Sequence, residues 1–184
     1  MMRVRRVVTG EPTPGESTFT HVEEVTPLVP FPGFAQYHVW GWDDEPKLPH
    51  HDAAPYTSKS HFPAPGAVRV TANYMAAMQD ERAEVDGEDE HAGDAAEFAR
   101  VMQAQDVGTI FGDAPGMHRT DTIDVGIVVS GEVTVESTDG TKVTLGPGDV
   151  YVQNGAVHAW HGNPENPAHM VFVIVGAQRD GAGG

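Results

Sequence analysis

The 184-residue sequence contains no cysteine, few basic residues and no long apolar run. Without cysteine the chain forms no disulfide and offers no thiolate nucleophile or thiolate metal ligand. Lys and Arg number 11 against 27 Asp and Glu, which gives a formal net charge of −16 at pH 7. This charge argues against a nucleic-acid partner and against an anionic membrane, because both require a basic surface.

The lack of a long apolar run argues against a membrane-spanning helix and against a signal peptide. No stretch approaches the ~18 apolar residues of a membrane-spanning helix, and the basic start of the chain precedes no apolar run of signal-peptide length. We therefore expect a soluble, cytoplasmic protein. Hydrophobic residues make up 39% of the chain, which suffices for the core of one domain.

Short strands separated by glycine and proline dominate the C-terminal half. Asp139-Gly140 predicts a tight hairpin, and the run Gly146-Pro147-Gly148-Asp149 predicts a turn before a strand over Val150–Gln153. The apolar run Ala168–Val175 predicts a final buried strand. Strands of this length and spacing are typical of a small antiparallel barrel or jelly roll.

Polar side chains alternate along the segment before these strands. In an extended strand His118, Thr120, Thr122 and Asp124 share one face, and the apolar Ile123 lies on the other. Because the flanking residues are strongly β-forming, we expect the polar row to point inward, where it needs a metal, a ligand or water as partner.

The stretch from Gly116 to Asn163 resembles the two sequence motifs of a cupin domain. Thr120 stands where the first motif has its second His, and Asp124 stands where it has Glu. The resemblance implies an all-β fold, a cupin-type double-stranded β-helix (jelly-roll barrel) with an N-terminal strand and loop extension and one short helix. The matching positions are Gly116, His118, Gly131, Gly148, Asp149, Gly155, His158 and Asn163.

The same reasoning divides the chain into four parts. Residues 1–78 supply strands and loops that extend the barrel or a dimer interface, and residues 79–94 form an acidic loop. Residues 95–177 form the barrel core, beginning with a helix over Ala95–Gln105 that Asp94 caps. Residues 178–184 are expected to be a flexible tail.

The resemblance implies one divalent metal ion, bound by His118, His158 and Asp124. Two imidazoles and a carboxylate suit Fe, Zn, Ni or Mn. Because Asp is shorter than Glu, Asp124 either touches the ion or orients His118 through a hydrogen bond. His161, Thr120, Gln153 or water would complete the shell. The alternative is a degenerate cupin, in which His118 and Asp124 form a buried pair and no ion is bound.

Three further histidines lie in a proline-rich segment, residues 46–65. The adjacent His50 and His51 and the nearby His61 suggest a metal site, but neighbouring rings do not easily aim at one ion. We expect these to be exposed loop histidines.

Two classes of function fit these residues. The first is a metal-dependent enzyme acting on a small organic molecule as a lyase (decarboxylase or dehydratase), an isomerase or a dioxygenase, with Asp124 or His161 as acid or base. Thr120, Gln153 and Trp160 are candidate substrate contacts. The resemblance implies a polyketide-like, aromatic or keto-acid substrate and a homodimer. The second class is a non-catalytic small-molecule-binding or sensor cupin.

Overall fold

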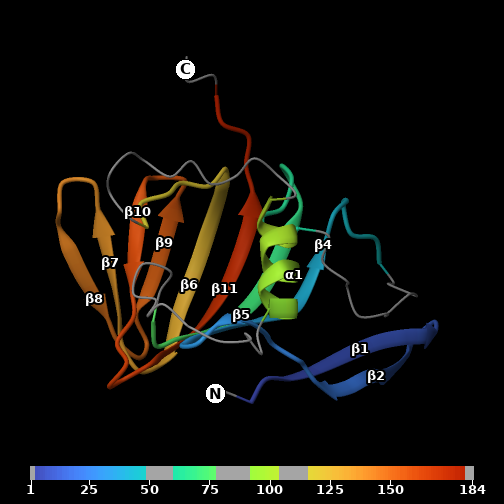
Figure 1. Ribbon diagram of the computed structural model, residues 1–184. Helices are drawn as coiled ribbons and strands as arrows, with labels where there is room; N and C mark the ends of the chain where they lie inside the picture. Colours follow the sequence, from blue (N-terminus) through green and yellow to red (C-terminus); the bar gives the residue numbers. More distant parts are fainter. Residues whose placement is uncertain (1–2, 49–59, 78–91, 104–115, 181–184) are drawn as a thin grey trace.

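The computed structural model describes residues 3–48, 60–77, 92–103 and 116–180, and these form antiparallel sheets with one helix (Figure 1). The predicted all-β jelly-roll fold is confirmed. The elements are β1 (Arg5–Thr13), β2 (Glu16–Glu24), β3 (Leu28–Phe31), β4 (Phe34–Trp42), β5 (Val68–Met75), α1 (Ala92–Gln103), β6 (Thr122–Ser130), β7 (Val133–Ser137), β8 (Lys142–Leu145), β9 (Val150–Asn154), β10 (His158–His161) and β11 (Ala168–Gly176).

Two sheets enclose the main core. The large sheet has the strand order β3-β4-β5-β11-β6-β9, and the small sheet has the order β10-β7-β8. The core between them combines Met170 and Phe172 of β11 with Val133, Val135 and Leu145 of the small sheet. Inward residues alternate with outward ones along β11, as expected for a sheet buried on one face.

The polar segment before β6 crosses from one sheet to the other. The sequence predicted one strand through His118 and Asp124, but the chain bends at Asp121 and β6 begins only at Thr122. His118 instead pairs with His158 beside the small sheet. The inward orientation of Asp124 is as predicted, since it is 9% exposed while its neighbour Ile123 is 44% exposed.

The helix begins earlier than the sequence predicted. α1 starts at Ala92 rather than Ala95, so Asp94 lies in its first turn instead of capping it. The Asp94 carboxylate accepts a hydrogen bond from the backbone N–H of Val29 at 2.9 Å. This bond ties the start of α1 to β3. The predicted helix stripe of Phe98, Val101 and Met102 and most of the acidic loop lie outside the described side chains.

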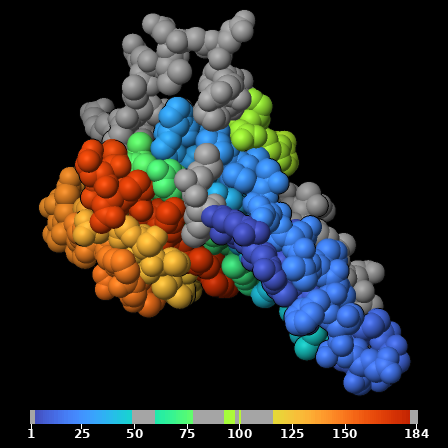
Figure 2. Space-filling model, turned by 90° about the horizontal axis from the view of Figure 1, so that it is seen from below, coloured from blue at the N-terminus to red at the C-terminus, as the bar shows by residue number. Residues whose placement is uncertain are grey.

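The N-terminal strands form a separate hairpin. β1 and β2 pair only with each other and project from the body (Figure 2). Arg6 holds the hairpin to the large sheet by donating to the carbonyl of Val39 at 3.0 Å, and it also pairs with Glu23 at 2.6 Å. Val4 and Val25 at the hairpin base pack on the outer face of β4 and β5.

Within the described ranges, no helix is both long and apolar enough to span a bilayer.

Candidate functional site

His118 and His158 form the centre of the candidate site. Their backbones exchange two hydrogen bonds of 2.9 Å, an N–H of each donating to the carbonyl of the other. This pairing places the imidazoles on neighbouring strands with ring centroids 4.5 Å apart. The sequence predicted that these two side chains converge, and the structure brings them together.

Backbone carbonyls orient both imidazoles. Nδ1 of His118 lies 2.8 Å from the carbonyl oxygen of Gly116, and Nδ1 of His158 lies 3.0 Å from that of Ala156. A protonated Nδ1 donating to each carbonyl leaves the Nε2 lone pair free, which is the arrangement of metal-binding histidines. Burial, followed by the nearby His118, lowers the pKa of His158 to about 4, so its ring is neutral at pH 7.

Gln153 supports His158. Its amide nitrogen donates at 2.7 Å to the carbonyl of Ala156, the same carbonyl that faces Nδ1 of His158, so the amide packs directly against the ring. Gln153 was expected to contact substrate, but in the structure it is 3% exposed and packed against the inner end of the histidine. It holds the ring in place.

Asp124 lies directly opposite Gln153 in the pairing of β6 with β9. Its Oδ1 is buried and has no hydrogen-bond partner among the described residues. Burial raises the pKa of Asp124 to about 6, and a hydrogen bond from Thr122 partly opposes this rise. A carboxyl group with such a pKa exchanges protons near neutrality, as a general acid or base does.

Aromatic rings form one side of the site. Trp160 lies on the same inward face of β10 as His158, with ring centroids 5.8 Å apart. Tyr151 stands edge-on to Trp160 at 5.1 Å, and Trp160 in turn contacts Phe172 at 5.9 Å. The predicted inward position of Trp160 is therefore what the structure shows, and the three rings connect the histidine pair to the core.

The C-terminal segment braces the turns beside the histidines. Arg179 donates to the backbone carbonyls of Thr120 and Gly155, each at 3.0 Å, and pairs with Asp121 at 2.5 Å. The sequence reading took residues 178–184 as a flexible tail, and no local motif marked Arg179. Thr120 itself is 2% exposed, and its hydroxyl bonds that of Thr122 at 2.7 Å.

His161 lies on the opposite face of β10 from His158 and Trp160. Its Nε2 is 2.6 Å from a carboxylate oxygen of Glu136, which also pairs with Lys142 at 3.1 Å. The candidate acid–base role of His161 would need a side chain on the inward face. The alternation of the strand turns it outward, so His161 is not part of the candidate site.

A metal ion at this site would rest on the histidine pair. The described residues contain no group of three or more His, Asp or Glu that could hold an ion, so Asp124 does not join the two histidines in one cluster. The two free Nε2 atoms fit a divalent transition metal, with water or substrate in the other positions. The three-residue ligand set stays a prediction.

The loop histidines divide into two groups. His50 and His51 lie outside the described residues. His61 is 7% exposed and packs against Phe62 at 4.5 Å, so the expectation of an exposed loop histidine was wrong for this residue. Arg69 of β5 ties segment 60–63 to the large sheet by donating a hydrogen bond to the carbonyl of Ser60 at 3.0 Å.

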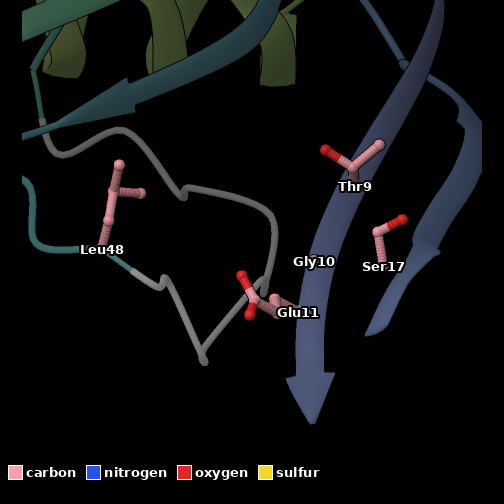
Figure 3. A pocket seen from close by; sticks show the side chains of 5 residues that line it. All are labelled: Thr9, Gly10, Glu11, Ser17 and Leu48. Carbon is pink, nitrogen blue, oxygen red and sulfur yellow. The ribbon is translucent and has the colours of Figure 1, made fainter. Parts of the chain in front are cut away.

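A surface hollow of about 490 Å³ lies away from the histidine pair, beside β1 (Figure 3). Among its described lining residues, Glu11 is the ionisable one and none is a histidine. We assign no function to it. Its lining residues are Thr9, Gly10, Glu11, Ser17 and Leu48.

Comparisons with known proteins match part of the chain. The model of the family "Cupin domain" matches residues 110–174. The chain is 39% identical over 67 residues to the cupin-domain-containing oxidoreductase srdB of Neurospora crassa, covering 34% of each protein. It is 45% identical over 62 residues to oryzines biosynthesis cluster protein J of Aspergillus oryzae, covering 34% of this chain and 32% of that protein.

The aligned part of the chain thus spans about a third of the length of these curated relatives. Among solved structures, the polyketide cyclase RemF from Streptomyces resistomycificus is similar with 13% identity and a TM-score of 0.43. That similarity covers 82% of this chain and 72% of RemF.

Proposed function

The chain belongs to the cupin superfamily through its residues 110–174, and from that premise we propose that it is a metal-dependent enzyme acting on a small organic molecule. The observation that carries the proposal is the histidine pair. Both His118 and His158 have Nδ1 against a backbone carbonyl, which directs both Nε2 atoms away from the backbone, on rings whose centroids are 4.5 Å apart. A merely structural pair would not need both nitrogens free.

Each residue then has a separate task. His118 and His158 would hold one divalent ion, Fe, Zn, Ni or Mn, which supplies a Lewis acid that polarises a carbonyl or carboxylate. Asp124 accepts or donates a proton at its unpartnered Oδ1. Gln153 packs against His158 and donates to the Ala156 carbonyl that orients the ring. Trp160 and Tyr151 supply an apolar wall that suits a planar substrate and excludes water.

The reaction that these groups support best is proton-transfer chemistry, namely decarboxylation, dehydration or isomerisation. A Lewis acid beside a carboxyl group with a pKa of about 6 provides both components that these reactions need. Keto acids and aromatic or polyketide-like molecules are the substrate classes proposed. The relative named for a biosynthesis cluster supports a role in small-molecule biosynthesis.

The test begins with elemental analysis after reconstitution with Fe²⁺, Zn²⁺, Ni²⁺ or Mn²⁺, one at a time. We expect about one ion per chain for at least one of them. Product analysis with keto acids and aromatic acids should then show turnover that requires the ion and falls in Asp124→Asn. Retention of none of the four ions contradicts the proposal. Ion binding without turnover supports the alternative of a non-catalytic binding or sensor module.

Dioxygenation is the second candidate reaction. Similar proteins that carry the name oxidoreductase favour it, and an ion held by only two imidazoles leaves positions open for dioxygen and substrate. Oxygen consumption by the iron-loaded protein distinguishes the two reactions. Substrate-dependent uptake supports dioxygenation, and product formation under nitrogen supports the lyase or isomerase.

We also propose that the protein is a homodimer joined through the outer face of the large sheet. Neighbouring strands β9, β6 and β11 expose a continuous set of aliphatic side chains without a charge among them, and so large an apolar patch marks an interface. The rest of the same outer face is covered from within the chain by Val4 and Val25. The exposed residues are Ile123, Ile127, Val129, Val150, Val152 and Val173.

A second copy is the occupant that fits this face. The patch presents no charge that a partner would have to match, and two copies would bury their uncharged faces against each other while their acidic surfaces remain in solvent. Val152→Lys should give a monomer by light scattering. Val143→Lys is the matched control, because Val143 is 51% exposed on β8 and Val152 is 52% exposed on β9. A monomeric wild-type protein contradicts this assembly.

A further inference from the structure

Most of the buried polar atoms without partners lie together, away from the histidine pair. Seven buried side-chain atoms have no hydrogen-bond partner among the described residues, and five of them lie on or beside the inner face of β4 and β5. We call these five side chains the β4–β5 polar cluster. Its unpartnered atoms are Gln36 Oε1, His38 Nε2, His61 Nδ1, Thr71 Oγ1 and Asn73 Oδ1.

Strand register builds the cluster. Gln36 is directly opposite Asn73, and His38 is directly opposite Thr71, in the antiparallel pair of β4 and β5. Side chains opposite each other in such a pair lie within contact distance, so the four form one patch. His61 completes it, with its ring centroid 6.0 Å from that of His38.

Four of the five side chains are buried as deeply as the hydrophobic core, and His38 is half-buried. Gln36, Thr71, Asn73 and His61 are from 0% to 8% exposed. A buried polar group without a partner destabilises the folded state, so nearly all such groups in proteins are bonded. Five unbonded groups in one place indicate that a bonding partner belongs there.

The neighbouring ion pair does not supply that partner. Arg69 is 2% exposed and donates to the carbonyls of Ser60, Trp42 and Val68 and to the carboxylate of Asp43. Each of these hydrogen bonds goes to a group outside the cluster. Arg69 and Asp43 also balance each other's charge.

β11 separates the cluster from the histidine site. Across the large sheet, Thr71 is opposite Phe172, which is opposite Gly126, and Asn73 is opposite Met170. Gly126 has no side chain, and a Cβ there would lie 2.6 Å from the Phe172 ring, so the ring leans over β6. The buried Phe172 and Met170 therefore lie between the cluster and Asp124 on β6, and β5 and β6 are about 10 Å apart, the width of two strand spacings.

The hydrogen-bonding groups of the cluster indicate what kind of ligand it could bind. Imidazole, amide and hydroxyl groups are uncharged, and each can both donate and accept hydrogen bonds. None of the five side chains is a carboxylate or a permanent cation. The charges of Arg69 and Glu97 act on His38, but each is paired with an opposite charge, Arg69 with Asp43 and Glu97 with Arg100. The hydroxyl group, which also donates and accepts, complements all five side chains. We propose that the β4–β5 polar cluster binds an uncharged, hydroxyl-bearing small molecule, such as a polyol or a sugar, at a site separate from the histidine pair.

The test uses nuclear magnetic resonance of the ¹⁵N-labelled histidine rings, because it reports each site separately. Glycerol, myo-inositol and D-glucose serve as probes of increasing size. At least one should cause a saturable shift of the His38 and His61 ring nitrogens, while those of His118 and His158 stay unchanged. If none of the three shifts His38 and His61, the proposal is wrong. A shift with Zn²⁺ alone would also overturn it in favour of a metal site.

Variants without the polar atoms separate binding from folding. Thr71→Val keeps the shape and removes an unbonded hydroxyl, so the free protein should melt about 2 °C higher or more, and binding of the probe should weaken at least tenfold. Thr134→Val, at a hydroxyl bonded to Thr144 on the small sheet, is the control and should leave binding unchanged. Asn73→Leu provides a second variant if Thr71→Val does not fold. Unchanged probe affinity in the folded variant contradicts the proposal.

Discussion

The interior of the protein has two polar regions that differ in how their groups are bonded. Near β6 and β9, backbone carbonyls occupy Nδ1 of both His118 and His158, and Asp124 is the unpartnered group. Near β4 and β5, five polar side chains have an atom without a partner among the described residues. In the first region the backbone orients the ring nitrogens, whereas in the second region strand register places four of the five side chains.

This difference shows how a small barrel can keep two polar sites apart. Turns and a backbone bridge fix the histidine pair, so its geometry depends little on the rest of the sheet. Pairing of two long strands fixes the cluster, so a shift of one residue would turn all its side chains outward. The experiments below test whether the two regions are as independent as the apolar β11 between them indicates.

Replacing one histidine in each region should give the largest expected difference, which is in the metal content of the two variants. We expect His158→Ala to abolish metal retention, because a single imidazole does not hold the ion. His61→Ala should retain the metal as the wild-type protein does. Mass-spectrometric metal analysis after gel filtration measures both. Equal loss of metal from the two variants would remove the distinction between the regions.

Because of Asp124, the free energy of unfolding should fall as the pH rises. The folded pKa of Asp124, about 6, lies above the ordinary value of 3.8, so the folded protein binds the proton more tightly than the unfolded chain. The contribution of Asp124 to the free energy of unfolding is therefore complete below pH ~4, and about 3 kcal/mol of it is lost as the pH rises through 6. Asp124→Asn should abolish this fall in urea denaturation curves, whereas Asp44→Asn, at an exposed position, should not.

Because of His61, the free energy of unfolding should fall as the pH drops. Burial, with the neighbouring His38 and Arg69, lowers the pKa of His61 to about 3. The unfolded chain therefore binds the proton more tightly, and stability falls as the pH drops below about 6.5. The loss attributable to His61 is about 2 kcal/mol between pH 7 and pH 5.

Denaturation of His61→Gln at both pH values measures this loss. The variant should be less sensitive to acid than the wild-type protein by that amount, and the exposed His21→Gln should behave as the wild type does. An unchanged acid response in His61→Gln would show that the ring is not held neutral in the folded state.

The sequence predicted the first region much better than the second. Cupin motif spacing identified His118 and His158, and strand alternation placed Asp124 and Trp160 on inward faces. Each of these predictions needs only a short stretch of sequence, because motif spacing and strand alternation are read from neighbouring residues. The crossing at Asp121 was missed, since alternation alone does not reveal a change of sheet between residues 118 and 122.

The second region had no such local signal. The opposition of His38 to Thr71 depends on pairing between strands 33 residues apart, and a one-residue irregularity after His38 resets the alternation. His61 was read as a loop histidine because its segment is rich in proline. Its burial follows from Arg69, which bonds the carbonyl of Ser60. Long-range register of this kind is not encoded in a short motif.

Arg179 has a practical consequence for handling the protein. A single side chain near the C-terminal end bonds the two turns that precede β6 and β10. A shortened version that ends at Gly176 would lose this brace although every strand remained. Affinity tags and fluorescent fusions should therefore follow a linker placed after Asp180, and trimming of the C-terminus should stop short of Arg179.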